Sequence, residues 1–198
     1  MNLEDYRALF ATVSLVLILV VAFPALSTVV SFPSGGERFS ELWLLGPNHM
    51  AEGYPFNVGV GEEYSVFVGV SNHMGCSEYY MVCVKFRNQT QPLPDSLNSI
   101  PSPLNSTYEF QFFLADGETW ESPLIFSVQG EPMFVGNISI NEVVFPVSCS
   151  STWESERNGF FYQLFFELWM YDGDSSSFRY HNRFVGIWLN TTVQEAAF

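Results

Sequence analysis

Hydrophobic residues follow two patterns along this chain, a continuous run near its start and then repeated alternation with a period of two. Residues 8–36 carry no charge, and the apolar part of this stretch is 8–32. Beyond residue 38 no stretch of useful length shows a helical period. Apolar and polar positions alternate there instead, which is typical of half-buried β-strands. The pattern therefore predicts one apolar helix followed by an all-β domain.

The alternation predicts seven to nine strands. In 64–70, for example, Val66, Val68 and Val70 would share one face of a strand. The clearest expected strands are 39–45, 64–70, 79–86, 108–114, 119–128, 137–147, 160–170 and 185–191. Strands in this number, without helical crossovers, favour two packed antiparallel sheets, an immunoglobulin-like β-sandwich over 39–198.

Turn-forming residues separate the expected strands. The dipeptide Asp116-Gly117 predicts a hairpin turn between 108–114 and 119–128. The proline-rich segment 89–103 cannot form a central strand. We expect it to be a long surface loop, which could cross between the two sheets.

The apolar run is long enough to cross a membrane. At ~1.5 Å per residue, a helix over 8–30 would span roughly 34 Å, against a hydrocarbon core of ~30 Å. Pro24 would kink this helix or mark its exit from the bilayer. A cleavable signal peptide ending near Ala25 is the alternative. We expect a signal anchor, with 1–7 in the cytoplasm, a transmembrane helix over 8–32 and a linker over 33–38.

The composition narrows the partners of the domain. Charged residues make up only 14% of the chain, against ~25% in soluble domains, which agrees with a membrane segment or heavy burial. The formal net charge is −14, and Lys85 is the only lysine. Such a chain repels phosphate backbones, so nucleic-acid binding is excluded. We expect a solvated acidic surface that faces outward from the cell.

Two stretches resemble a known family. The segment LLGPNHMAEGYPFNVGVGEEYSVFVGVSNH, residues 44–73, and the closing strand RYHNRFVGIWLN, residues 179–190, are similar to the archaeal membrane-protein family called domain of unknown function 1616. The resemblance spans 38–192. It implies an archaeal protein with an extracytoplasmic β-domain, at least one membrane helix and no known activity. Many members carry several membrane helices, so a single one implies partner chains within the membrane. The run 61–80 is also similar to archaeal cell-adhesion modules of the immunoglobulin type.

Four N-glycosylation sequons lie in the expected β-domain, at Asn88, Asn105, Asn137 and Asn190. A single sequon carries little information, but four in one domain indicate an N-glycosylated, extracytoplasmic surface. This places the amino terminus inside and the β-domain outside. Asn137 and Asn190 fall within or at the end of expected strands, which makes them weaker acceptors than the other two.

Outside the cytoplasm a disulfide is permitted. Cys76 lies in an expected turn and Cys149 follows a strand end, whereas Cys83 lies in the middle of a strand. We expect a Cys76–Cys149 disulfide, with Cys83 as a packed free thiol. Three reduced cysteines, or a pair that includes Cys83, are the alternatives.

No stretch carries a catalytic or metal-binding pattern, and we expect no cofactor. His73-Met74-Gly75-Cys76 offers copper ligands, but Cys149 has no histidine beside it. The acidic turn that begins at Asp172 lacks the glycine and the final glutamate of a calcium-binding loop. Acidic pairs such as Glu62 with Glu63, or Asp116 with Glu118, could be a glycosidase pair, but turns are where solvated charges are expected.

The most informative side chains are aromatic. Phe165, Trp169 and Trp188 would lie opposite the main apolar face of their strands. A sheet that is apolar on both faces is covered on both. These three side chains are therefore candidates for a protein interface, unless a second small core beneath the long loops or a sugar-binding platform explains them.

Together these patterns predict a non-enzymatic accessory or structural subunit. Its glycosylated ectodomain would pack against other membrane or surface-layer chains of an archaeal envelope. A module that binds glycan or cell-wall polymer is the second hypothesis. An enzyme that acts on envelope polysaccharide ranks last.

Overall fold

A computed structural model describes residues 6–7, 10–18, 20 and 37–191. The chain divides into two compact units, Met1–Glu37 and Arg38–Phe198. In the first unit, residues 6–7, 10–18 and 20 are helical, and apolar side chains such as Phe10, Leu15 and Leu17 are exposed. Within the described residues, no helix has both the length and the apolar character needed to span a bilayer. Most of the predicted helix beyond residue 20, and the linker up to residue 36, lie outside the described residues.

The described residues of the second unit form ten strands, one more than the upper limit expected from the alternation. They are β1 (Phe39–Leu45), β2 (Tyr64–His73), β3 (Glu78–Asn88), β4 (Tyr108–Leu114), β5 (Thr119–Glu131), β6 (Phe134–Ile140), β7 (Val143–Ser150), β8 (Trp153–Glu154), β9 (Gly159–Asp172) and β10 (Ser177–Asn190).

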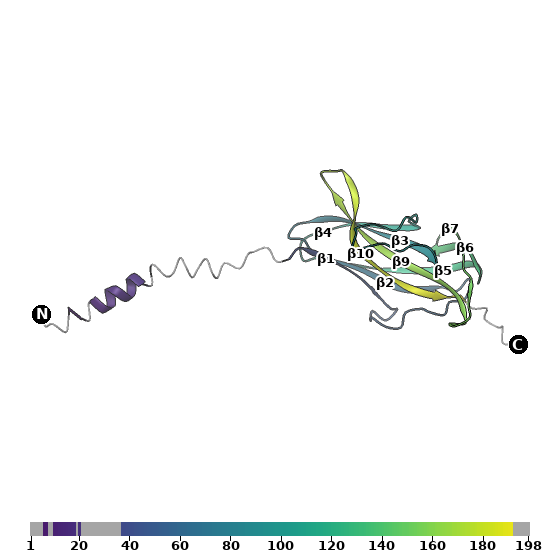
Figure 1. Ribbon diagram of the computed structural model, residues 1–198, viewed down its shortest axis with the longest axis horizontal. Helices are drawn as coiled ribbons and strands as arrows, with labels where there is room; N and C mark the ends of the chain where they lie inside the picture. Colours follow the sequence, from purple (N-terminus) through teal and green to yellow (C-terminus); the bar gives the residue numbers. More distant parts are fainter. Residues whose placement is uncertain (1–5, 8–9, 19, 21–36, 192–198) are drawn as a thin grey trace. The chain divides into compact units, whose positions relative to one another are not determined.

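The strands form two antiparallel sheets (Figure 1). The first sheet has the order β1-β2-β5-β6-β7, and the second has the order β10-β9-β3-β4, with the short β8 paired to β9. This confirms the predicted all-β arrangement of two antiparallel sheets, whereas the immunoglobulin-like topology stays a prediction.

The core lies between the sheets and uses the predicted faces of the strands. Val66, Val68 and Val70 of β2 are completely buried, and they face the alternate residues of β3 and β9. On β9 the core residues are Tyr162, Leu164, Phe166 and Leu168. Burial of this apolar area, at roughly 25 cal/mol per Å², is the main force that holds the two sheets together.

One predicted strand is in fact two. The expected strand 137–147 is interrupted at Asn141 and Glu142, and β6 and β7 pair with each other across this turn. Both turn residues have positive φ angles, 49° and 70°. Two successive positive φ angles define the tight turn that suits the right-handed twist of a hairpin, and asparagine adopts them readily.

The turn at Asp116 and Gly117 is not a hairpin. It carries the chain from β4 in the second sheet to β5 in the first. The Gly117 N–H donates to the Asn72 carbonyl at 2.7 Å, and the Asn72 N–H donates to Glu118 at 3.0 Å. The hairpin prediction is wrong because the backbone of β2 holds this turn at the end of the sandwich, where the flanking strands separate.

Two long connections complete the unit. Residues 46–63 join β1 to β2, and residues 89–107 join β3 to β4. The second connection is the predicted surface loop, hereafter the covering loop. Because β3 and β4 are neighbours in one sheet, it does not cross between the sheets.

Candidate functional site

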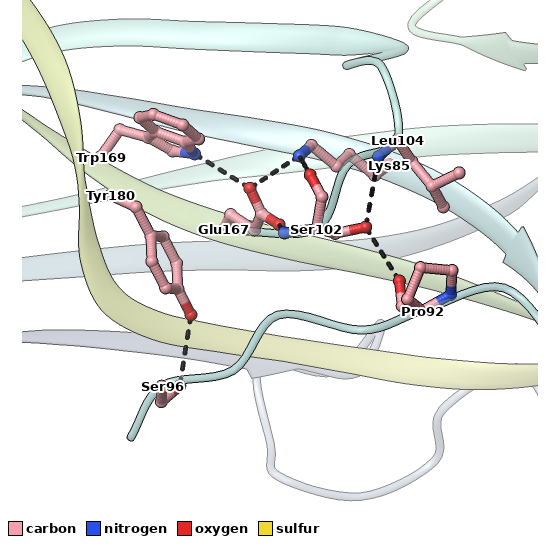
Figure 2. Close-up of polar contacts among 8 residues, drawn as sticks. All are labelled: Lys85, Pro92, Ser96, Ser102, Leu104, Glu167, Trp169 and Tyr180. Atoms are coloured by element: carbon pink, nitrogen blue, oxygen red, sulfur yellow. Dashed lines mark hydrogen bonds and ion pairs between the residues drawn. The ribbon is translucent and has the colours of Figure 1, made fainter. Parts of the chain in front are cut away.

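The outer face of the second sheet carries a buried ion pair beneath the covering loop. Lys85 on β3 and Glu167 on β9 point away from the core, yet they are only 3% and 0% exposed. The Lys85 Nζ lies 2.8 Å from Glu167 Oε2. Figure 2 shows the pair with the loop residue Ser102 beside it. We call Lys85, Ser102, Glu167 and Trp169 the loop anchor.

The polar groups of the loop anchor bond one another. Lys85 Nζ donates to the Ser102 carbonyl at 2.9 Å, and the Ser102 N–H donates to Glu167 Oε1 at 2.8 Å. The Trp169 indole N–H donates to Glu167 Oε2 at 3.0 Å. Both charges are thereby paired and hydrogen-bonded, which is the condition under which a buried ion pair is tolerated.

A second set of contacts holds the start of the covering loop. Arg87 donates from Nε to Gln163 Oε1 at 2.7 Å and from Nη1 to the Gln91 carbonyl. Its guanidinium lies 5.2 Å from the centroid of the Trp188 ring. Further along, the hydroxyls of Ser96 and Tyr180 lie 3.2 Å apart. The loop is thus bound to β3, β9 and β10 along its length.

The structure shows what lies over the predicted interface candidates. Phe165 is completely buried, and Trp169 and Trp188 are partly buried. All three are on the outer face that carries the loop anchor. Phe165 lies opposite Lys85 across β9 and β3, Trp169 belongs to the loop anchor, and Trp188 lies against the Arg87 guanidinium. This arrangement matches the alternative of a small core beneath a long loop. One signal in the sequence could have identified this buried cluster. Lys85, the only lysine, falls in the middle of an expected strand, and Glu167 falls in the middle of another.

The four sequons differ in accessibility. Asn105 and Asn137 are exposed. The Asn88 side chain is partly buried and closes a turn, because its Oδ1 accepts bonds from Thr90 and Gln91. Asn190 is 5% exposed, with its Nδ2 3.3 Å from Asn57 Oδ1. A glycan on Asn190 does not fit the folded domain, whereas Asn105 and Asn137 leave room for one.

The three cysteines are free and well separated. Cys76 lies just before the start of β3. Cys149 contacts Gln91, which lies just after the end of β3. At ~3.3 Å per residue, β3 separates the two by roughly 35 Å, and a disulfide needs Cα atoms within about 7 Å. The expected Cys76–Cys149 disulfide is therefore wrong for this fold. The error came from placing both cysteines at strand ends without knowing which ends of the sandwich they occupy.

The acidic turns are held by their own neighbours. Asp172 accepts a hydrogen bond from Ser175 and an ion-pair contact of 2.8 Å from Arg179. These partners lower the pKa of the Asp172 carboxyl. Asp116 accepts from the Gly75 N–H. Within the described part of the chain, no three histidine, cysteine or acidic residues are grouped as metal ligands.

A second feature lies at one open edge of the sandwich, where β1 and β10 run side by side (Figure 1). Between them is a mostly apolar cleft of about 550 Å³. Its walls are Leu42, Trp43, Leu44, Tyr54, Pro55, Phe56, Val185, Gly186, Ile187 and Trp188. We call it the edge cleft. Residues 54–56 belong to the connection between β1 and β2, which no periodic pattern in the sequence marked as part of a site.

The sequence profile of a protein family described as "Domain of unknown function (DUF1616)" matches residues 33–134, which is 102 of the 198 residues. The chain belongs to the DUF1616 family. The match begins before β1 and ends at the first residue of β6, so it includes β1, the connection to β2 and the whole covering loop. No curated protein matches the sequence significantly.

Two solved structures illustrate the loose likeness of this DUF1616 protein to known folds. A chain from the complex of Zinc 2-glycoprotein and Prolactin inducible protein from human seminal plasma is 9% identical, with a TM-score of 0.39, covering 80% of this chain and 99% of that one. A β-glucosidase mutant from Listeria innocua, in complex with laminaribiose, is 13% identical, with a TM-score of 0.43. That match covers 78% of this chain and 16% of the glucosidase. TM-scores this low indicate no function.

The loop anchor predicts a large difference between single and paired substitutions. Glu167→Gln leaves Lys85 buried without a counter-charge, and Lys85→Met leaves Glu167 in the same position. Each single substitution should lower the free energy of unfolding by about 3–5 kcal/mol. The double variant should be less destabilised than the sum of the two by about 1–3 kcal/mol. Denaturant unfolding measures the cycle. Arg179→Met, which breaks an exposed ion pair, is the control and should cost about 1 kcal/mol or less. Single substitutions as mild as this control would contradict the assignment.

Thiol labelling distinguishes the three cysteines. Burial raises the pKa of the Cys83 and Cys149 thiols to about 11, so neither forms appreciable thiolate near pH 8. Cys76 is exposed, although its hydrogen bond to Glu78 raises its pKa as well. Iodoacetamide at pH 8 should label Cys76 in the folded protein, and the other two only in denaturant. Intact-mass spectrometry counts the labels, and a molecule that takes none until it is reduced would restore the disulfide.

Proposed function

We propose that this protein is a non-enzymatic, membrane-anchored accessory or structural subunit whose β-sandwich packs against partner chains. The observation that carries the proposal is the edge cleft. It combines an apolar depression with two strands that end their sheets, at a place that residues 37–191 leave uncovered. Open apolar surface beside an unpaired strand edge is a feature of protein-binding sites.

The first unit supports the membrane anchor. Its described helical residues expose a nearly continuous apolar surface, and the uncharged stretch continues to residue 36. Exposed sequons at Asn105 and Asn137 support an extracytoplasmic β-domain, with the amino terminus in the cytoplasm. The family membership supports an archaeal envelope as the setting.

The strand order supports the finer description of the sandwich as immunoglobulin-like. An immunoglobulin fold has seven strands, A to G in chain order. One sheet has the neighbours G, F and C, and the other sheet has the order A-B-E-D. Here β10, β9 and β3 stand in this relation, and β1-β2-β5 begins the other sheet. The pair β6 and β7 would then be an addition to the basic plan.

Glycan binding is the second candidate, supported by one exposed aromatic group. The rings of Tyr79 and Phe113 stack with centroids 4.2 Å apart, and Phe113 is 73% exposed. Sugar rings stack on such aromatic surfaces, but neighbouring polar groups must also form hydrogen bonds with the sugar hydroxyls. Tyr79 already bonds Gln111, so this surface offers less than the edge cleft. An envelope enzyme has no comparable support and ranks last.

The glycosylation proposal separates the sequons by accessibility. In the native host, Asn105→Gln and Asn137→Gln should each remove the mass of one glycan from the protein. Asn190→Gln should leave the glycan mass unchanged, because the Asn190 side chain is buried. Glycopeptide mass spectrometry makes the comparison. A protein without any glycan, or one modified at Asn190 alone, would contradict the extracytoplasmic, folded arrangement.

The partner proposal is tested by the native size of the full-length protein extracted in mild detergent. Wild type should migrate as part of a larger complex. Phe56→Asp places a charge on the exposed wall of the edge cleft and should release the monomer. Leu97→Asp, at a side chain that is 96% exposed on the covering loop, is the matched control and should leave the complex intact. A wild-type protein that is strictly monomeric would remove the proposal.

A further inference from the structure

We propose that the edge cleft binds an extended apolar segment of another chain, flanked by Lys or Arg, which adds to the sandwich as a strand along β10 and β1. This inference rests on the proposed role as a partner-binding subunit and specifies how the partner is held. Three observations support this inference. They are the open backbone edges of β10 and β1, the side chains between these edges, and the charge of the domain.

The end of the β10 edge already pairs with a segment from outside the sheet, residues 56–58. The Asn190 N–H donates to the Phe56 carbonyl at 2.6 Å, and the Val58 N–H donates to the Asn190 carbonyl at 2.9 Å. This single parallel bridge ends at Phe56, where the edge cleft begins. Alternate residues of a strand direct their backbone groups to the same side. Trp188 and Gly186 therefore direct theirs into the cleft, where β10 has no neighbouring strand among the described residues.

The β1 edge repeats the pattern from the opposite wall. The Ser40 carbonyl accepts a bond from Arg183 Nε at 3.2 Å, and the Leu44 carbonyl accepts one from the Tyr54 hydroxyl at 2.8 Å. By the same alternation, Leu42 between them points its N–H and C=O away from β2. Within the described residues, β1 pairs only with β2. Leu42 thus offers an open donor and acceptor at the middle of the cleft.

The side chains between the two edges suit an apolar strand. Leu42, Phe56 and Ile187 present aliphatic and aromatic surface to the cleft, and Phe56 is 48% exposed. Gly186 leaves the centre of the β10 wall without a side chain. A Cβ at that position would lie 2.8 Å from the Cβ of Phe165, so the buried outer face requires the glycine. An inserted strand would cover these groups with its alternate side chains and pair its backbone with both walls.

Charge decides between a second copy and a different chain. The protein carries a net charge of −14, and two of its seven basic residues, Lys85 and Arg87, are buried under the covering loop. The segment 38–63, which borders the cleft, has four glutamates and one arginine. Two copies would repel each other, whereas a segment flanked by Lys or Arg is attracted. The occupant we infer is therefore a basic-flanked segment of another protein.

The test uses the full-length protein in detergent and a phage library of random ten-residue peptides. Enriched peptides should alternate apolar with polar residues, lack proline and carry Lys or Arg at their ends. A synthetic copy of the best binder should protect the amides of Leu42, Gly186 and Trp188 from hydrogen exchange. Raising NaCl from about 0.05 M to about 0.5 M should weaken its binding, because salt screens the charges.

Leu42→Pro removes the N–H that faces the cleft and spares the ladder to β2, so peptide affinity should fall about tenfold or more. If this variant does not fold, Phe56→Ser removes an exposed wall instead, and Leu97→Ser is the control for both. A library without enrichment, acidic or proline-rich binders, or affinity that is unchanged in the variants would overturn the inference. A native complex that survives Leu42→Pro would overturn strand addition alone, whereas the absence of any complex would remove the proposed function.

Discussion

The structure depends on the burial of β9 on both faces. One face of β9 supplies Tyr162, Leu164, Phe166 and Leu168 to the core, and the other supplies Phe165 and Glu167, which are equally buried. An antiparallel sheet normally leaves one face in water. Here the second face needs a cover, and the covering loop provides it. The loop anchor follows from this constraint, because a loop without regular structure must bond its own backbone groups to something.

The buried ion pair determines where the covering loop lies, and it adds little to the stability of the fold. Removing Lys85 and Glu167 from water costs several kcal/mol each, and their attraction roughly offsets that cost. The orientation of the Ser102 peptide is what the pair determines. Its carbonyl meets the ammonium and its N–H meets the carboxylate, so only one placement of the loop satisfies all four groups. A purely apolar contact with Phe165 would tolerate several placements.

The sequence was sufficient for those features that depend on local pattern. The alternation of apolar and polar residues located the strands, and it identified the core-facing sides of β2, β3 and β9. A strand that is buried on one side has an apolar residue at every second position. It failed where the answer depended on which elements meet. Asp116-Gly117 has the composition of a hairpin turn, yet the Asn72 backbone holds it between sheets. Cys76 and Cys149 both lie at strand ends, but at opposite ends. The loop anchor brings Lys85 together with Ser102 and Glu167, which lie 17 and 82 positions further along the chain. No spacing in the sequence indicates that meeting.

The four sheet edges show which part of the domain is left open. On β7, Pro146 lacks an N–H, and Ser148 has a positive φ of 44°. The middle of β10 is interrupted by an irregularity at Asn182, and its end pairs with residues 56–58. On β4, Glu109 and Gln111 alternate with the aromatic residues. Proline, bulges and charge are the usual means by which proteins prevent edge-to-edge association. Along the edge cleft, Glu41 is the only one of these devices on β1 and β10. Among the described residues, this stretch therefore has both the apolar side chains and the unpaired backbone groups that an added strand needs.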